Sequence, residues 1–98
     1  MRRPFIEPAI PAGVAFEIAD LILLESWAAA HGLRMNVSLN YCDPDGEYEE
    51  MISICARGDH AVRWLIWRAG EIIVQPMIGR RITCSSVTKA IEILSSQL

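Results

Sequence analysis

The side chains of this chain that most readily bind metals or act as nucleophiles belong to three cysteines and two histidines. They are Cys42, Cys55, Cys84, His31 and His60. No two of them have the close spacing that structural zinc sites use. Scattered residues of this kind are more often small apolar thiols and surface histidines. The sequence therefore predicts no metal site and no cofactor.

Catalysis by a cysteine requires a base, usually histidine, within hydrogen-bond reach. Cys42 ends the first predicted strand, whereas His60 lies in the turn after the second, so we expect a whole strand between them. Cys84, Ser85 and Ser86 also have no base nearby in the sequence. A glycine-rich phosphate-binding loop is absent. We therefore predict a non-enzymatic protein without catalytic residues. An enzyme with no recognisable motif is kept as the third hypothesis, after the two that are given below.

An acidic segment, DPDGEYEE, occupies residues 43–50. Its carboxylates are ligands that calcium prefers, but the spacing of an EF-hand loop and its flanking helices are missing. The segment is better interpreted as an acidic hairpin loop that keeps a sheet edge soluble.

The elements that position these residues follow from apolar periodicity and turn residues. Residues 1–11, with three prolines, predict an extended arm, and residues 12–98 predict one domain. A helix is expected over residues 12–31, between Pro11 and Gly32. Strands are expected over residues 33–41, 50–57, 62–67 and 71–75, and Ser85 or Ser86 should cap a final helix. The predicted fold is α+β: a two-layer sandwich with a four-stranded antiparallel meander and both helices on one face (α-β-β-β-β-α).

The first helix is apolar on more than one side, so its buried face is a choice between alternatives. Placing residues at helical spacing favours a broad core face. That core face comprises Ala15, Phe16, Ile18, Ala19, Ile22, Leu23, Ala29 and Ala30. Leu21, Leu24 and Trp27 then fall on or beside the outer face, where they predict an exposed apolar patch that a protein partner would cover.

The third strand contains two tryptophans three residues apart, which a strand directs to opposite faces. Because Arg63 interrupts one set, we predict that Val62, Trp64 and Ile66 are core. Leu65 and Trp67 are then left on the open face, beside Arg63.

Three explanations for this open face are considered. The N-terminal arm covers it, or the face packs against a second copy, or it docks another protein. Aromatic residues and arginine are enriched at such interfaces. The preferred hypothesis is a small interaction or regulatory protein, acting as a homodimer or with another protein, through Arg63, Leu65 and Trp67 first and Leu21, Leu24 and Trp27 second.

The runner-up hypothesis is RNA binding. The order helix, antiparallel meander, helix resembles the topology of the double-stranded RNA-binding domain, a fold that contacts phosphates and 2′-hydroxyls. The resemblance implies an RNA-binding role for Arg80, Arg81 and Lys89. The family's glycine–proline–histidine loop and lysine cluster are missing, and a fourth strand is expected. The net charge of −3 also argues against nucleic acid as the partner.

The amino-acid composition indicates what kind of protein this is and in which cellular compartment it is expected. Of the residues, 52% are hydrophobic and 21% charged, which is typical of a globular domain. No apolar run reaches the roughly 18 residues that span a bilayer, so no membrane partner is expected. Prolines interrupt any apolar region at the start of the chain, so no signal peptide is predicted, and the cysteine count is odd. A cytoplasmic protein with free thiols is therefore expected.

Overall fold

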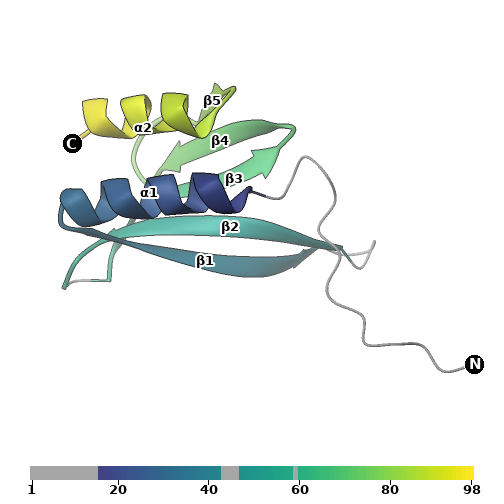
Figure 1. The fold of residues 1–98 in the computed structure, drawn as a ribbon, viewed down its shortest axis with the longest axis horizontal. Helices are drawn as coiled ribbons and strands as arrows, with labels where there is room; N and C mark the ends of the chain where they lie inside the picture. The colour runs from purple at the N-terminus through teal and green to yellow at the C-terminus, as the bar shows by residue number, and fades with distance from the viewer. Residues whose placement is uncertain (1–15, 43–46, 59) are drawn as a thin grey trace, which may run out of the picture.

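The computed structural model describes residues 16–42, 47–58 and 60–98 (Figure 1). Its elements are α1 (Ile18–Ala30), β1 (Leu33–Cys42), β2 (Glu47–Ala56), β3 (Val62–Ala69), β4 (Glu71–Pro76), β5 (Ile82–Cys84) and α2 (Val87–Ser96). The strands form one antiparallel sheet in the order β1-β2-β3-β4-β5. Both helices lie on one face of it (Figure 1), α1 on the β1 side and α2 on the β4 and β5 side. The predicted α+β sandwich is therefore confirmed, with five strands in place of four.

The additional strand, β5, lies in the segment that the sequence suggested was only a connector. Ile72 pairs with Cys84, and Val74 pairs with Ile82. Three residues are too few to show the alternation that identifies a strand in a sequence. The prediction of a plain connector over residues 77–84 is therefore wrong at its end.

The turns between neighbouring elements follow the residues that permit them. Gly32 has a φ of +69°, the left-handed conformation that glycine adopts at little cost, and it ends α1 where the sequence predicted. Gly70 has a φ of +78° and joins β3 to β4. Helix α1 is shorter than the helix predicted over residues 12–31. Phe16 and Glu17 precede its first residue, and residues 12–15 lie outside the described part.

The packing face of α1 is the reverse of the predicted one. Leu24 is 0% exposed and Trp27 is 8% exposed, and both belong to the core beneath the helix. Ile18 and Ile22, predicted to be core, are exposed. The helix is apolar nearly all round, so hydrophobic spacing alone does not select a face. The prediction for Phe16 is confirmed, since its ring is buried. The backbone N–H of Phe16 donates to Glu50 Oε1 at 2.7 Å.

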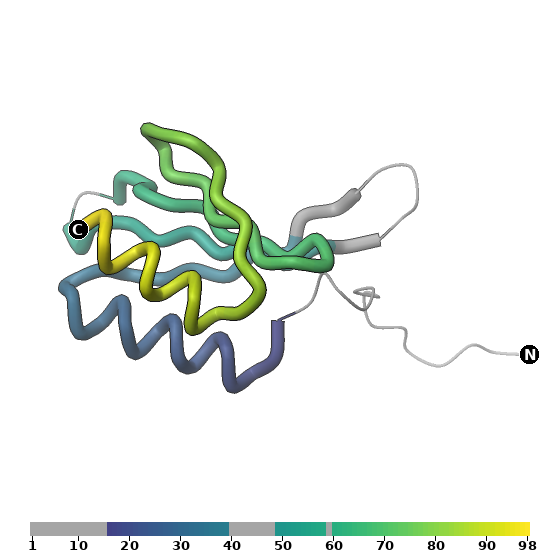
Figure 2. The backbone as a smooth tube through the Cα atoms, turned by 90° about the horizontal axis from the view of Figure 1, so that it is seen from above, coloured from purple at the N-terminus to yellow at the C-terminus, as the bar shows by residue number. Residues whose placement is uncertain are grey.

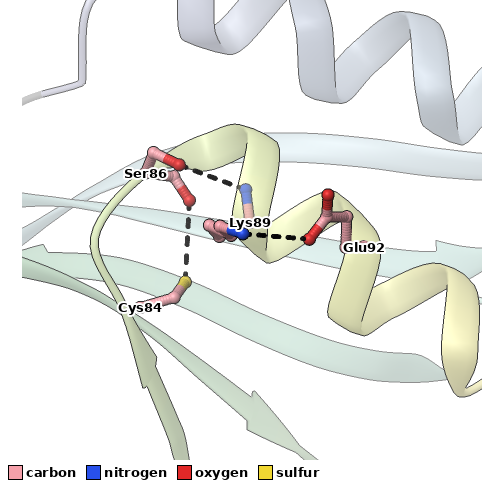
Figure 3. A network of polar contacts seen from close by, with 4 residues as sticks. All are labelled: Cys84, Ser86, Lys89 and Glu92. Carbon is pink, nitrogen blue, oxygen red and sulfur yellow. Dashed lines mark hydrogen bonds and ion pairs between the residues drawn. The ribbon is translucent and has the colours of Figure 1, made fainter.

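The amphipathic helix α2 follows its prediction except at Leu98, which was expected on the apolar face but lies beyond the helix end and is exposed. Ser86 is the N-cap, and its Oγ accepts the Lys89 N–H at 3.2 Å (Figure 3). The apolar residues Val87, Ala90 and Leu94 are buried against the sheet. Here polar and apolar residues separate clearly around the helix, so the sequence predicts both the element and its face.

Two buried tryptophans join the helix layer to the sheet. Trp27 Nε1 donates to Ser95 Oγ at 3.0 Å, and Trp64 Nε1 donates to Gln97 Oε1 at 2.7 Å. The two indoles meet edge to face, with centroids 6.2 Å apart. Each ring therefore fills core volume while its polar N–H is satisfied by residues at the end of α2. This pair links α1, β3 and α2 at one end of the sandwich.

Candidate interaction surface

The face of the sheet without helices carries a short apolar stripe. Trp64 and Ile66 are buried beneath the helices, so the alternating residues Leu65 and Trp67 point to the opposite side, as predicted. Their cross-strand neighbours extend the surface over β2 and β4. We call the following four half-buried residues the open-face stripe: Met51, Leu65, Trp67 and Ile73.

A guanidinium group lies over the largest ring of the open-face stripe. The Arg81 carbon Cζ is 5.0 Å from the centroid of the Trp67 ring, a cation–π contact. Arg81 Nε also donates to Gln75 Oε1 at 3.3 Å, which orients the guanidinium. Gln75 in turn donates through Nε2 to the Pro76 carbonyl at 2.8 Å. The stripe is thus bordered on the β5 side by a positioned positive charge.

Arg63 lies at one end of the stripe and also lines a separate groove. A shallow open groove of about 600 Å³ lies where β3 begins and β4 ends. Its lining comprises Val62, Arg63, Trp64, Pro76, Met77, Ile78 and Gln97. Val62, which the sequence suggested was core, is 37% exposed at this end, whereas its companions Trp64 and Ile66 are buried as predicted. Arg63 therefore connects the groove with the open face.

The second predicted patch does not exist on the surface. Leu24 and Trp27 are core residues, and Leu21 is half-buried against them. Their placement on an outer face is wrong because the helix turns the opposite side to solvent. The residues that α1 exposes instead are Ile18, Ile22 and Leu23. Sequence reasoning assigned these three to the core, so it identified an apolar surplus on this helix but assigned it to the wrong side.

The cysteines and histidines are placed separately. Cys55 is buried, and its Sγ lies 3.8 Å from Arg34 Nη2 and 3.7 Å from Asn36 Nδ2. Arg34 Nη2 also lies 2.6 Å from His60 Nδ1, which must accept because a guanidinium has only donors. His31 contacts the carbonyl of Trp27 through Nδ1. Among the residues that the structure describes, no group of three His, Cys, Asp or Glu could hold a metal ion.

The second described cysteine, Cys84, lies under the start of α2. Its Sγ donates to the Ser86 carbonyl at 3.6 Å (Figure 3). Burial raises the pKa of the Cys84 thiol, and the Glu71 carboxylate acts in the same direction. A raised pKa disfavours the reactive thiolate. Cys55 and Cys84 are both free thiols, while the side chain of Cys42 lies outside the described residues.

The three cations of the RNA hypothesis do not share one surface. Arg81 lies over Trp67 on the open face, whereas Lys89 belongs to the helix that covers the other face. Lys89 Nζ lies 3.7 Å from Glu92 Oε2, an exposed pair (Figure 3). Arg80 is exposed. The structure thus gathers no group of basic residues from this set.

Comparisons with known proteins give no relative for the chain. Nothing matches among protein-family models, among curated proteins or among solved structures. Within the described part of the chain, neither helix has both the length and the apolar character needed to span a membrane. The surface chemistry of the described residues is therefore the basis for any functional proposal.

Proposed function

We propose that this chain is a small, non-enzymatic cytoplasmic interaction protein whose open sheet face contacts a protein partner. The observation that carries the proposal is the open-face stripe, with Trp67 at its centre and arginines on two sides. Aromatic residues and arginine are the side chains that most often contribute strongly to protein interfaces. Two free thiols, Cys55 and Cys84, suit a reducing compartment.

The chemistry of this surface indicates the kind of partner. The stripe offers apolar contact area, and Arg63 and Arg81 place positive charge at its borders. A partner with an apolar centre and acidic side chains around it would complement both features. Arg81 would then exchange part of its contact with Trp67 for a carboxylate of the partner.

The test compares two variants for association and for folding. Trp67→Ala removes the centre of the stripe, while Thr88→Ala changes an exposed residue of α2 and serves as the matched control. Sedimentation over a concentration series detects contact with a second copy, and a pull-down from the source cell detects another protein. We expect an association that Trp67→Ala abolishes and Thr88→Ala preserves, with both variants retaining the circular dichroism of the parent.

Two results would overturn the proposal. One is that no association, with a second copy or with a cellular protein, is weakened by Trp67→Ala, which would leave the open face without a partner. The other is the absence of any association, with itself or with a cellular protein, for the folded parent chain.

A further inference from the structure

The outer edge of β1 is the second surface of interest, and its backbone directions can be deduced from the ladder. The Met77 N–H donates to the Arg63 carbonyl at 3.0 Å, so these two residues form a hydrogen-bonded pair between β3 and β4. In an antiparallel strand, successive residues direct their N–H and C=O to alternate sides. Three residues after Arg63, Ile66 therefore directs its groups toward β2, where it pairs with Ile52.

The same alternation continues across β2. Since Ile52 bonds to β3, its neighbour Met51 bonds to β1, where its partner is Ser38. Ser38 therefore directs its backbone inward. The flanking residues Met35, Val37 and Leu39 direct their N–H and C=O groups outward, away from the sheet. Among the described residues, β1 pairs with β2 alone, so these outward groups form a free strand edge.

The side chains along this edge are apolar and exposed. Val37 and Leu39 face the helix layer, yet they are 43% and 46% exposed. Ile18 and Ile22 of α1 are 75% and 59% exposed. At 100° per residue, Ile18 lies on the side of α1 opposite Trp27, whose indole reaches α2.

In Figure 1, α1 lies between α2 above it and β1 below it, so the side of α1 away from α2 is the β1 side, and Figure 2 shows the two helices running side by side. An apolar strip from two elements therefore runs beside the unpaired backbone. Protein edges are normally protected by lysine, proline or a bulge. In β1 the residues Leu33–Cys42 include one charge, Arg34, and no proline.

We propose that β1 pairs antiparallel with β1 of a second copy about a two-fold axis, so that the two sheets become one. Antiparallel self-pairing places residues of the same face together, so the apolar strips meet on the helix side. It also places Arg34, near one end of β1, far from Arg34 of the second copy, which avoids a like-charge pair. In a register centred on Val37, Met35 lies opposite Leu39 of the second copy.

The N-terminal segment of the same chain is the less suitable occupant of this edge. It contains Pro4, Pro8 and Pro11, and each proline lacks the N–H that a partner strand must donate. The second copy offers an unbroken row of donors and acceptors in matching register. The inference does not depend on the proposed function, since it concerns a different surface from the open-face stripe.

The principal test removes one backbone N–H at the free edge of β1 and keeps the hydrogen bonds between β1 and β2. Val37→Pro deletes the outward N–H of Val37, a change that edge strands tolerate. Val37→Ala is the matched control, because it shortens the side chain and retains the N–H. By sedimentation equilibrium we expect a dimer whose dissociation constant rises at least about tenfold in Val37→Pro. The control should change it much less, and Trp67→Ala should leave it unchanged.

A second variant tests the same edge without a proline, in case Val37→Pro does not fold. Leu39→Lys places a charge on the edge strip, and Thr88→Lys adds the same charge on α2. Only Leu39→Lys should dissociate the dimer. In the parent chain, amide hydrogen exchange at Met35, Val37 and Leu39 should slow as concentration rises, while exchange at Ser38 should be slow throughout.

Three outcomes would overturn the inference. The first is a parent chain that stays monomeric over the concentration series. The second is protection of the Val37 amide that is independent of concentration, which would assign the edge to a segment of the same chain. The third is a dimer that survives both Val37→Pro and Leu39→Lys; if Trp67→Ala then abolishes it, the edge inference fails while the proposed function stands.

Discussion

Trp64 and Trp67 are the same residue type on the same strand, but the two sheet faces give them different surroundings. Trp64 is buried beneath the helices, touches Trp27 edge to face and donates to Gln97. Trp67 is half-buried, and a single guanidinium lies over its ring. On one face the ring is surrounded by core, and on the other it is partly open to a partner. The contrast indicates that Trp64 contributes mainly to folding, whereas Trp67 is the ring that the proposed contact would use.

The strongest test of this comparison is to truncate each tryptophan. We expect Trp64→Ala to lower the free energy of unfolding by about 3–5 kcal/mol, because it leaves a cavity and an unpaired Gln97. Trp67→Ala should lower it by about 1 kcal/mol, the typical effect of a change at a partly exposed position. Urea unfolding followed by circular dichroism measures both. Equal losses would mean that the open face is as important to the fold as the covered one.

A smaller effect tests how firmly the helix layer is held to the sheet. Ser86→Ala removes the side-chain acceptor at the start of α2 and should cost about 1 kcal/mol of stability. Ser85→Ala, at the exposed neighbouring position, is the control and should cost little. Thermal unfolding suffices, since about 1 kcal/mol corresponds to a shift of about 4–8 °C for a domain of this size. If both variants melt alike, the Ser86 cap contributes nothing to the covered face.

On the open face, Arg81→Gln should lower stability by about 0.5 kcal/mol, the effect of a partly exposed cation–π contact. Arg81→Lys keeps the charge without the planar group and separates stacking from net charge. Urea titration should give the order parent, Lys variant, Gln variant. A Gln variant as stable as the parent would show that the contact between Arg81 and Trp67 adds nothing measurable to the stability of the fold.

The smallest expected effect is a pH dependence at Cys84. Its pKa is raised in the folded state by burial, so folding favours the protonated thiol. The stabilisation from this group is therefore complete below the ordinary thiol pKa and is lost as the pH rises through the raised value. Unfolding at neutral pH and at about pH 10 should show a larger alkaline loss for the parent than for Cys84→Ala. Identical alkaline losses would contradict the assigned role of burial.

How much of the fold the sequence predicts depends on how clearly polar and apolar residues separate in each element. In β1 and α2 the separation is clear, and the predicted faces agree with the structure. In β3 both faces are apolar and Arg63 alone selected one of them; Trp64 and Ile66 are buried as predicted, whereas Val62 is exposed. In α1, leucine, isoleucine and alanine occur on every side. Leu24 and Trp27 were therefore misplaced by spacing alone. The choice between faces depends on tertiary contacts such as the bond from Trp27 to Ser95, which no local pattern reveals.

The candidate surfaces show the same limit. The positions of Leu65 and Trp67 on the open face follow from alternation with Trp64 and Ile66. The stacking of Arg81 on Trp67 does not follow, because it requires β5 to pair with β4. The sequence also did not reveal that Val37 and Leu39 are exposed, because alternation predicts the face on which a residue lies but not whether a helix covers it.

The bond between Trp27 and Ser95 joins residues 68 positions apart, whereas each strand pairs with the next one along the chain. Contacts between nearby residues cost less loop-closure entropy and tend to form early, while distant ones form late. The meander is therefore expected to assemble before α1 and α2 meet. During that interval the sheet would expose Trp64 and its neighbours to solvent, which makes the completion of α2 the step at which the nascent protein stops being prone to aggregation.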